Sequence, residues 1–181
     1  PHETGSPAVD FNLDGTLVAT GAYDGKVRLW DVSSGELLNV LDSNEGTVWS
    51  VDFSPNGHLI AAGSDDDKVT VWNVNTGEIK YEFTESSHNI WEVVFNPTGD
   101  YLAASGNDNA IRIYNMETGK LIKTILGHSM VPLAMDFSPN GNLLASAGDD
   151  KTIKIWDTKT WELIHTLKGE NEALHSVVFI G

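Results

Sequence analysis

The sequence predicts an all-β protein built from four copies of one small antiparallel sheet, and two observations carry this prediction. The first is a step of 42 residues that recurs through the 181-residue chain. The second is that each step contains short segments of alternating apolar and polar residues, separated by turns rich in glycine, proline and aspartate. Self-similarity at about 40–45 residues is typical of repeat architectures. The residues that mark the step most clearly are Phe11, Phe53, Phe95, Phe137 and Phe179.

Residues 44–85 illustrate the elements of one repeat. TVWSVDF (47–53) is predicted as a first strand that stops at a Ser-Pro-Asn-Gly turn, and HLIAAGS (58–64) as a second strand that an acidic turn ends. KVTVWNV (68–74) and EIKYEFT (78–84) alternate with period two and are predicted as the third and fourth strands. Because one such sheet is too small to bury both of its faces, neighbouring sheets must stack. Four-stranded sheets packed face to face around an axis form a β-propeller.

Composition restricts the classes of partner. The chain has 11 basic and 26 acidic residues and a net charge of −15, which would repel phosphate backbones, so no nucleic-acid partner is expected. It has no cysteine, which excludes disulfides and thiolate metal sites. No apolar run approaches about 18 residues and no stretch at the start has the form of a signal peptide, so we expect no membrane span and a cytoplasmic or otherwise intracellular location.

Several short motifs repeat in phase. They are Trp30-Asp31 and Trp156-Asp157, varied to Trp72-Asn73 and Tyr114-Asn115, together with FSPNG at 53–57 and 137–141 and Gly127-His128. With these motifs the chain resembles the WD-repeat β-propeller family across essentially its whole length. The resemblance implies a partial ring of four blades at residues 2–43, 44–85, 86–127 and 128–169, in one domain spanning 1–181. Residues 170–181 would then supply the first strand of a fifth blade.

The family typically has a hydrogen-bonded tetrad of His, Ser or Thr, Asp and Trp in each blade, which pairs polar groups that would otherwise be buried alone. Carried over by position, the first blade would have His2, Thr20, Asp24 and Trp30, and the fourth blade His128, Ser146, Asp150 and Trp156. The second blade keeps only Asp66 and Trp72, and the third Asp108 and Tyr114. We therefore expect the two middle blades to be less firmly held.

Three segments contain residue types of other sites. Asp10 to Gly15 matches the start of a calcium-binding loop, but Gly21 stands where the bidentate Glu is needed, so a hairpin is the favoured interpretation. The run Asp65-Asp66-Asp67 is interpreted as a turn and its solvated neighbours. His128, Ser146 and Asp150 are the residue types of a hydrolase triad, but they coincide with the tetrad. We expect no catalytic residues, no metal and no cofactor.

Binding is expected on the loops around the central opening, because rigid blades fix loops whose sequences are free to vary. By resemblance, these positions lie six and four residues before each repeated Phe and one residue before each turn Asp. They are Thr47/Trp49, Asn89/Trp91, Val131/Leu133 and Ala173/His175, with Tyr23, Asp65, Asn107 and Asp149. Two interpretations of Trp49 and Trp91 remain open: they anchor an interface with a polar rim, or they pack between blades.

The function predicted from these features is a non-catalytic protein-interaction scaffold. Its partner would be a protein or peptide, and the acidic surround favours a basic segment. The partner-binding candidates are Tyr23, Trp49, Asp65, Trp91, Asn107, Leu133 and Asp149. The alternative is a structural, self-assembling half-propeller that completes a ring with other copies or with the rest of a longer chain, so that the chain is a homo-oligomer or a fragment of a larger propeller.

Overall fold

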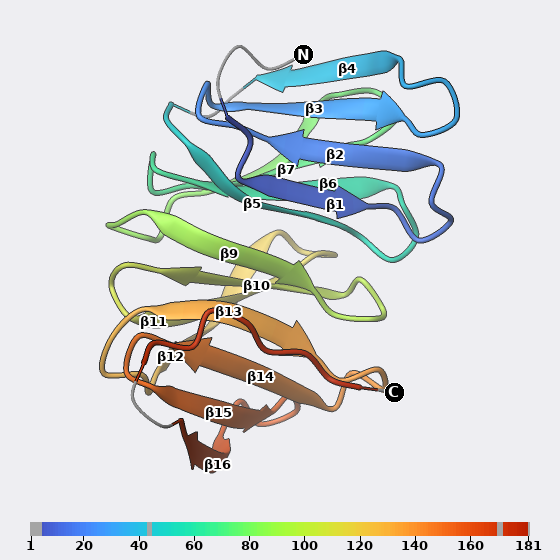
Figure 1. The fold of residues 1–181 in the computed structure, drawn as a ribbon. Coiled ribbons are helices and arrows are strands. Elements are labelled where there is room, and N and C mark those ends of the chain that lie inside the picture. Colours follow the sequence, from blue (N-terminus) through green and yellow to red (C-terminus); the bar gives the residue numbers. More distant parts are fainter. Residues whose placement is uncertain (1–4, 43–44, 170–171, 181) are drawn as a thin grey trace. The chain divides into compact units, whose positions relative to one another are not determined.

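A computed structural model describes residues 5–42, 45–169 and 172–180. Within these ranges the chain forms sixteen strands and no helix. The strands make four antiparallel sheets of four strands each (Figure 1). This confirms the predicted all-β class with four-stranded blades. The chain divides into two compact units, residues 1–93 and 94–181.

The first unit contains two complete blades, and in each the strands pair in the order in which they follow one another in the sequence. The template strands predicted within 44–85 start and end within one residue of the observed ones. Blade 1 consists of β1 (Ala8–Phe11), β2 (Leu17–Gly21), β3 (Lys26–Asp31) and β4 (Leu37–Asp42), and blade 2 of β5 (Val48–Phe53), β6 (Leu59–Ser64), β7 (Val69–Asn73) and β8 (Ile79–Phe83).

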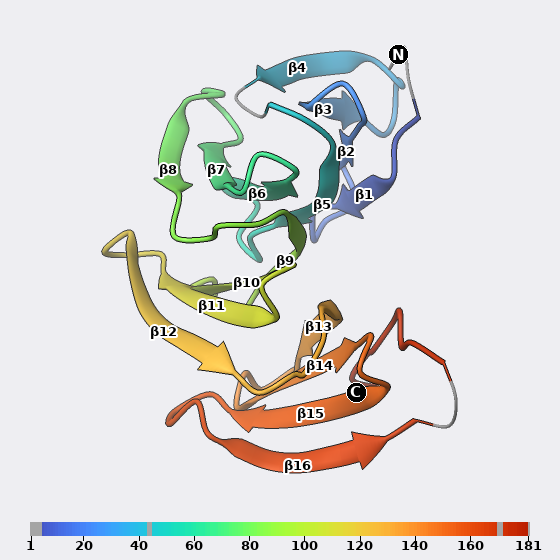
Figure 2. The same ribbon diagram turned by 90° about the vertical axis from the view of Figure 1, so that its left-hand side faces the viewer.

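The remaining strands repeat the same order, which can be followed for β13 to β16 in Figure 2. The division between the two units falls inside β9. Blade 3 consists of β9 (Ile90–Phe95), β10 (Tyr101–Gly106), β11 (Ala110–Asn115) and β12 (Lys120–Leu126), and blade 4 of β13 (Pro132–Phe137), β14 (Leu143–Gly148), β15 (Thr152–Asp157) and β16 (Leu163–Lys168).

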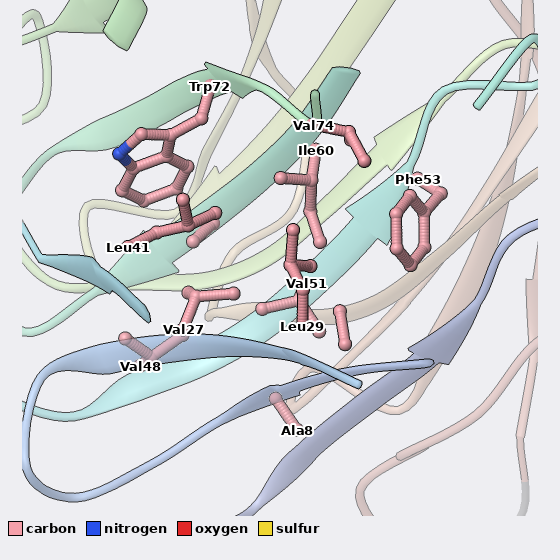
Figure 3. Packing of buried hydrophobic residues seen from close by; sticks show 12 residues of the cluster. Ala8, Val27, Leu29, Leu41, Val48, Val51, Phe53, Ile60, Trp72 and Val74 are labelled. Atoms are coloured by element: carbon pink, nitrogen blue, oxygen red, sulfur yellow. The ribbon is translucent and has the colours of Figure 1, made fainter. Parts of the chain in front are cut away.

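The core of the first unit lies between its two blades (Figure 3). Blade 1 contributes small and aliphatic side chains, among them Val27, Leu29 and Leu41, and blade 2 contributes Phe53 and Trp72. Each of these five side chains is at most 6% exposed. The second unit repeats the arrangement, because one cluster joins aliphatic residues of β11 and β12 to aromatic residues of blade 4. The alternation predicted from the sequence therefore buries one face of blade 1 against blade 2, and one face of blade 3 against blade 4.

The segment predicted as the first strand of a fifth blade differs from the expectation. Its described part, residues 172–180, contains no strand. A strand is defined by its ladder with a neighbour, and residues 172–180 form no such ladder with the other described residues. Nevertheless, the backbone N–H of Phe179 donates to Asp136 Oδ2 at 2.6 Å, just as the N–H of Phe53 donates to Asp10 Oδ2 at 2.8 Å. The segment therefore lies against blade 4 as β5 lies against blade 1.

One turn departs from the repeat. Gly35, Gly77 and Gly119 adopt positive φ, and Trp161 stands at the equivalent position with φ 57°. Glycine enters this region freely, whereas other residues are strained there. The Trp161 ring packs edge-on against Tyr101, with centroids 5.9 Å apart. This aromatic contact offsets part of the backbone strain.

Candidate functional site

Three aromatic side chains of the first unit lie in contact where the predicted binding loops are. Trp49 of β5 packs on Trp91 of β9 with ring centroids 4.9 Å apart and an angle of 37° between the planes. Tyr23, in the turn between β2 and β3, meets Trp49 edge to face at 6.0 Å. Tyr23 is 52% exposed, and both tryptophans are half-buried. These three residues are called the aromatic cluster below.

A β-bulge directs Trp49 toward this cluster. Val48 pairs with Ser64 and Ser50 pairs with Gly63, so Trp49 is an extra residue in β5. A bulge bends the strand and redirects a side chain, and bulges are frequent near functional sites. As a consequence, the two buried residues Val48 and Val51 are three positions apart instead of two. The prediction of a regular alternating strand over 47–53 missed this feature.

Asp65 connects Trp49 to the segment that precedes β9. Its Oδ1 accepts hydrogen bonds from Trp49 Nε1 and from Asn89 Nδ2, each at 2.6 Å. Its backbone N–H donates to the carbonyl of Thr47 at 3.0 Å. Among the residues that the structure describes, the second carboxylate oxygen of Asp65 has no hydrogen-bond partner. One oxygen therefore holds the site together, and the other remains available to a ligand.

The surroundings of Asp65 are acidic. Asp66 and Asp67 follow it directly, and Asp66 accepts the backbone N–H of Glu45 at 3.0 Å. The next residue, Lys68, is turned to Glu82, with Nζ 3.2 Å from the carboxylate. The hydrogen bond and the charge of Glu82 raise the pKa of Lys68. The nearest cation in the sequence is thus already paired, which leaves the turn at the cluster with a net negative charge.

The second unit carries the other predicted binding residues. Leu133 is also the extra residue of a bulge, because Pro132 pairs with Gly148 and Ala134 with Ala147. Asp149 donates its backbone N–H to the carbonyl of Val131 at 2.9 Å, as Asp65 does to Thr47. Asn107 is exposed, and Leu133 is half-buried. Leu133 and Asp149 therefore have the same backbone setting as Trp49 and Asp65, but Leu133 carries an aliphatic side chain in place of a ring.

The residues of the fourth-blade tetrad lie together in the order that the resemblance implies. Trp156 Nε1 donates to Ser146 Oγ at 2.8 Å, and Ser146 Oγ lies 2.7 Å from His128 Nε2. His128 Nδ1 lies 3.0 Å from both carboxylate oxygens of Asp150. One tautomer satisfies every contact: Nδ1–H donates to Asp150 and Nε2 accepts the Ser146 hydroxyl. The chain of bonds pairs an indole and an imidazole that are buried.

Protonation of the tetrad follows from burial. Burial lowers the pKa of His128 and outweighs the attraction of Asp150, so the imidazole is neutral at pH 7. Burial alone would raise the pKa of Asp150. Hydrogen bonds from the Thr152 hydroxyl, the Ser129 N–H and His128 outweigh it and lower the pKa to about 2. The pair therefore consists of a carboxylate and a neutral ring.

The other blades hold the same aspartate with different partners. In blade 1, Trp30 Nε1 donates to Thr20 Oγ1 at 2.9 Å, while Asp24 pairs with Arg28 at 2.8 Å. His2 lies outside the described residues. In blade 3, Asp108 pairs with Arg112.

Blade 2 uses a hydroxyl instead, since Ser64 Oγ donates to Asp66. Trp72 and Tyr114 are each 1% exposed in blades 2 and 3. In blades 2 and 3 the aspartates therefore have partners that the sequence analysis did not name. The repeated position four residues after the aspartate, occupied by Arg28 and Arg112, was the available signal.

The structure also bears on the hydrolase triad and the calcium-binding loop whose residue types the sequence contains. Ser146 is fully buried, so its hydroxyl cannot meet a substrate. Asp10 to Gly15 belongs to a hairpin in which Gly15 N–H donates to the Asn12 carbonyl at 2.9 Å and Gly15 has φ 69°. Over residues 5–42, 45–169 and 172–180 there is no cluster of three or more His, Asp or Glu able to hold a metal ion. In the same ranges no helix has the length and apolarity needed to cross a membrane.

Comparison with known proteins agrees with the geometry. Residues 8–177 match the family model described as the second β-propeller of the echinoderm microtubule-associated protein. The F-box-like/WD repeat-containing protein TBL1X of Mus musculus is 38% identical over 50 residues, which are 28% of this chain and 9% of that protein. The WD40 repeat-containing protein HOS15 of Arabidopsis thaliana is 43% identical over 42 residues, 23% of this chain and 7% of that protein.

A third relative is the eukaryotic translation initiation factor 3 subunit I of Phaeosphaeria nodorum, 44% identical over 43 residues, which are 24% of this chain and 13% of that protein. Each of these matches is about as long as one 42-residue step. The chain therefore spans only a small part of the length of these relatives.

Proposed function

Because this chain belongs to the WD-repeat β-propellers, in the family of the second β-propeller of the echinoderm microtubule-associated protein, we propose that it is a non-catalytic protein-interaction scaffold. The proposed binding site is the aromatic cluster of Tyr23, Trp49 and Trp91, together with Asp65. Its occupant is a protein or peptide partner. Asn107, Leu133 and Asp149 are further candidate positions on the loops of the second unit.

The contact between the three rings is the observation that carries this proposal. Large aromatic side chains that are partly exposed and held in place are typical of the residues that contribute most to binding energy at interfaces. Here the bulge sets the direction of Trp49, and Asp65 fixes its indole through a 2.6 Å hydrogen bond. A site whose side chains are already ordered loses less conformational entropy when a partner binds.

The chemistry of the site favours a basic segment. Lysine and arginine side chains bind over the faces of tryptophan and tyrosine, at about 0.5–1 kcal/mol at exposed sites and more where water is excluded. The second oxygen of Asp65 adds an acceptor beside the rings. The net charge of −15 attracts cationic partners and accelerates their association. Aromatic contact and negative charge thus select the same class of partner.

A titration with peptide probes tests the proposal. The probe is an extended peptide rich in lysine and arginine, and the control is a peptide of equal length in which glutamate replaces each basic residue. Fluorescence anisotropy should show saturable binding of the basic peptide that weakens as salt is added, and no binding of the acidic one. The matched variant Asp65→Asn keeps the size of the side chain and should weaken binding of the basic peptide. Equal binding of both peptides, or binding that Asp65→Asn leaves unchanged, contradicts the proposed site.

The family relationship also supports a scaffold without catalysis and an intracellular location for this chain. Two of the relatives are named as WD-repeat proteins and a third is a translation initiation factor subunit, which is consistent with both proposals. Turnover of a substrate by the purified chain would overturn the first of these proposals. Secretion of the native protein would overturn the second.

A further inference from the structure

Two departures from the 42-residue step meet in the second unit. Tyr101, the first residue of β10, stands where the other three blades have leucine, and Trp161, in the turn between β15 and β16, stands where they have glycine. The equivalent residues are Leu17, Leu59 and Leu143 for the first position and Gly35, Gly77 and Gly119 for the second. The two rings are nearly perpendicular, at 87°, with centroids 5.9 Å apart. Tyr101 and Trp161 are called the perpendicular pair below.

The perpendicular pair lies between blades 3 and 4. Both residues pack, together with Val94, against the core cluster that joins these two blades. Position 161 faces the preceding blade, as its equivalent Gly77 shows, because a Cβ on Gly77 would lie 2.6 Å from Asn39 Nδ2 of blade 1. The pair is therefore on the side of blade 4 that faces blade 3, and not on the side where a further blade of a longer chain would pack.

Trp161 adopts a backbone conformation that suits glycine better. Its φ of 57° lies in the left-handed region, where a residue with a side chain is strained. Glycine forms the same turn in the three other blades with φ between 64° and 72°. Residues held in such conformations cluster at ligand-binding and active sites. The turn itself does not need a tryptophan, so the reason for the ring lies in what the ring contacts.

The contact with Tyr101 leaves the polar atoms of both rings unused. Within the part of the chain that the structure describes, neither Trp161 Nε1 nor the Tyr101 hydroxyl has a hydrogen-bond partner. Both atoms reach solvent, since neither is among the buried polar atoms that lack a partner. By contrast, Trp30, Trp49 and Trp156 each donate their indole N–H to an oxygen of the chain. The perpendicular pair thus combines half-buried rings with two donors that are free to bind a partner.

We propose that the perpendicular pair binds a proline-rich segment of a partner protein in the polyproline II conformation. Such segments dock on surfaces lined by aromatic rings, because the extended helix is formed before binding and loses little entropy. Two rings set at nearly a right angle can contact one pyrrolidine ring on two sides.

The unused donors favour proline over other apolar residues. Proline has a carbonyl but no N–H, so a proline-rich segment offers acceptors to Trp161 Nε1 and to the Tyr101 hydroxyl without burying a donor of its own. The carbonyls of polyproline II make no internal hydrogen bonds, whereas those of a helix are already paired. No charge is required, which distinguishes this surface from the aromatic cluster and its basic partner.

The surface is also separate from the binding loops of the proposed function. Asp149, a candidate residue on those loops, precedes β15, and Trp161 follows it, so the two residues lie at opposite ends of that strand. The inference therefore goes beyond the proposed function, and each site can be tested while the other is left intact.

Titration with an oligoproline peptide tests the proposal. The probe is a fluorescein-labelled oligoproline, and the control is a glycine–serine peptide of equal length with the same label. Fluorescence anisotropy should show saturable binding of the oligoproline that added salt leaves unchanged, and no binding of the control. In a two-dimensional ¹⁵N spectrum the indole signal of Trp161, assigned by its absence in Trp161→Phe, should shift during the titration. The signal of Trp156, which is buried in blade 4, should stay in place.

Three variants separate the contributions to binding. Trp161→Gly restores the residue that fits the φ of this turn and should abolish binding while the fold is kept, which a melting curve checks. Trp161→Phe keeps a ring without the N–H and should weaken binding about three- to tenfold, the effect of one lost hydrogen bond. Tyr101→Leu restores the residue of the other blades and should also weaken binding. If Trp161→Gly lowers the melting temperature, Trp161→Phe and the indole shift decide the question.

Absence of saturable binding, equal binding of both peptides, or binding that Trp161→Gly leaves unchanged overturns the proposal and reduces the perpendicular pair to a packing contact. Capture of the basic peptide should be the same in Trp161→Gly as in the wild-type chain, because the aromatic cluster belongs to the first unit. Failure of the oligoproline titration therefore leaves the proposed function standing. Failure of the basic peptide to bind likewise leaves this inference standing.

Discussion

The tetrad of blade 4 and the aromatic cluster of the first unit both contain an indole that donates to a polar side chain, but they differ in exposure. Trp156 is 3% exposed and donates to Ser146, itself fully buried. Trp49 is half-buried and donates to Asp65 at the start of the turn after β6. A buried N–H must have a protein partner, because water cannot replace it. An N–H near the surface can be satisfied by water when its partner is lost.

The difference separates residues that stabilise the blades from residues that can bind. The stabilising residues form hydrogen bonds inside one blade, so substituting one of them should lower the folding free energy. The binding residues lie at strand ends and turns, where a substitution leaves the core intact. Substituting one of them should therefore weaken binding without a large change in stability. Four predictions test this distinction, and a fifth test compares the clustered tryptophans with a core tryptophan.

Truncation of the buried indole should have the largest effect. Trp156→Ala removes a buried ring and the indole N–H that donates to Ser146 Oγ, which should cost about 3–5 kcal/mol of folding free energy. Tyr114→Ala, at the equivalent place in blade 3, should cost less because its blade lacks that hydroxyl partner. Urea unfolding of both variants measures the difference. Equal losses would count against the role assigned to the tetrad.

Removal of the central hydroxyl should have the next effect. Ser146→Ala leaves Trp156 Nε1–H and His128 Nε2 unpaired in the core, and an unsatisfied buried group costs about 1–3 kcal/mol. Ser105 on β10 is the matched control, since its hydroxyl is buried without a hydrogen-bond partner among the described residues. Ser105→Ala should be neutral or stabilising. The idea fails if both substitutions shift the midpoint of unfolding in the same direction by similar amounts.

Acid should weaken blade 4 through its charged pair. The pKa of Asp150 falls from 3.8 to about 2 on folding, so its contribution is complete above pH 3.8 and is lost as the pH falls toward 2. A shift of this size corresponds to about 2 kcal/mol. The lowered pKa of His128 acts with the same sign from pH 6.5 downward, since the unfolded chain then binds a proton that the buried ring resists.

The difference in stability between wild type and Asp150→Asn isolates this contribution from those of other carboxyl groups. It should be largest near neutral pH and shrink between about pH 4 and pH 2. Urea unfolding at a series of pH values measures it. A difference that stays constant across the range would show that Asp150 has no lowered pKa in the folded chain.

Replacement of Asp65 should have the smallest effect on stability. Asp65→Asn keeps an oxygen for Trp49 Nε1 and Asn89 Nδ2 at a partly exposed position, so the folding free energy should change by less than about 0.5 kcal/mol. Capture of a basic peptide should fall nevertheless, because the negative charge is gone. A large drop in stability would place Asp65 with the tetrad residues, contrary to the distinction drawn above.

Local sequence patterns predicted much of the fold and part of the site. The 42-residue step located the four sheets, and alternation identified the inward side chains of the third strands, such as Val27 and Leu29. The members of the blade 4 tetrad followed from the family resemblance, carried over by position within the repeat. These features are predictable because each depends on spacing within one repeat.

The features that the sequence did not predict depend on partners in space. The bulge at Trp49 depends on the register between two strands, which alternation by itself does not specify. Asp24 pairs with Arg28, and Asp108 pairs with Arg112. These pairings depend on which of several nearby groups lies within hydrogen-bond distance of the carboxylate in the folded chain. The lack of a strand in 172–180 depends on a neighbour and not on the segment, whose composition suits a strand.

The most direct test replaces the two clustered tryptophans. In Trp49→Ala and Trp91→Ala, capture of the basic peptide and the melting temperature are measured side by side, with Trp156→Ala as the reference for a core indole. Loss of capture in the first two variants at an unchanged melting temperature is the predicted result. Intact capture with a melting temperature lowered as in Trp156→Ala would show that the aromatic cluster only packs the blades, and would contradict its role as a binding site.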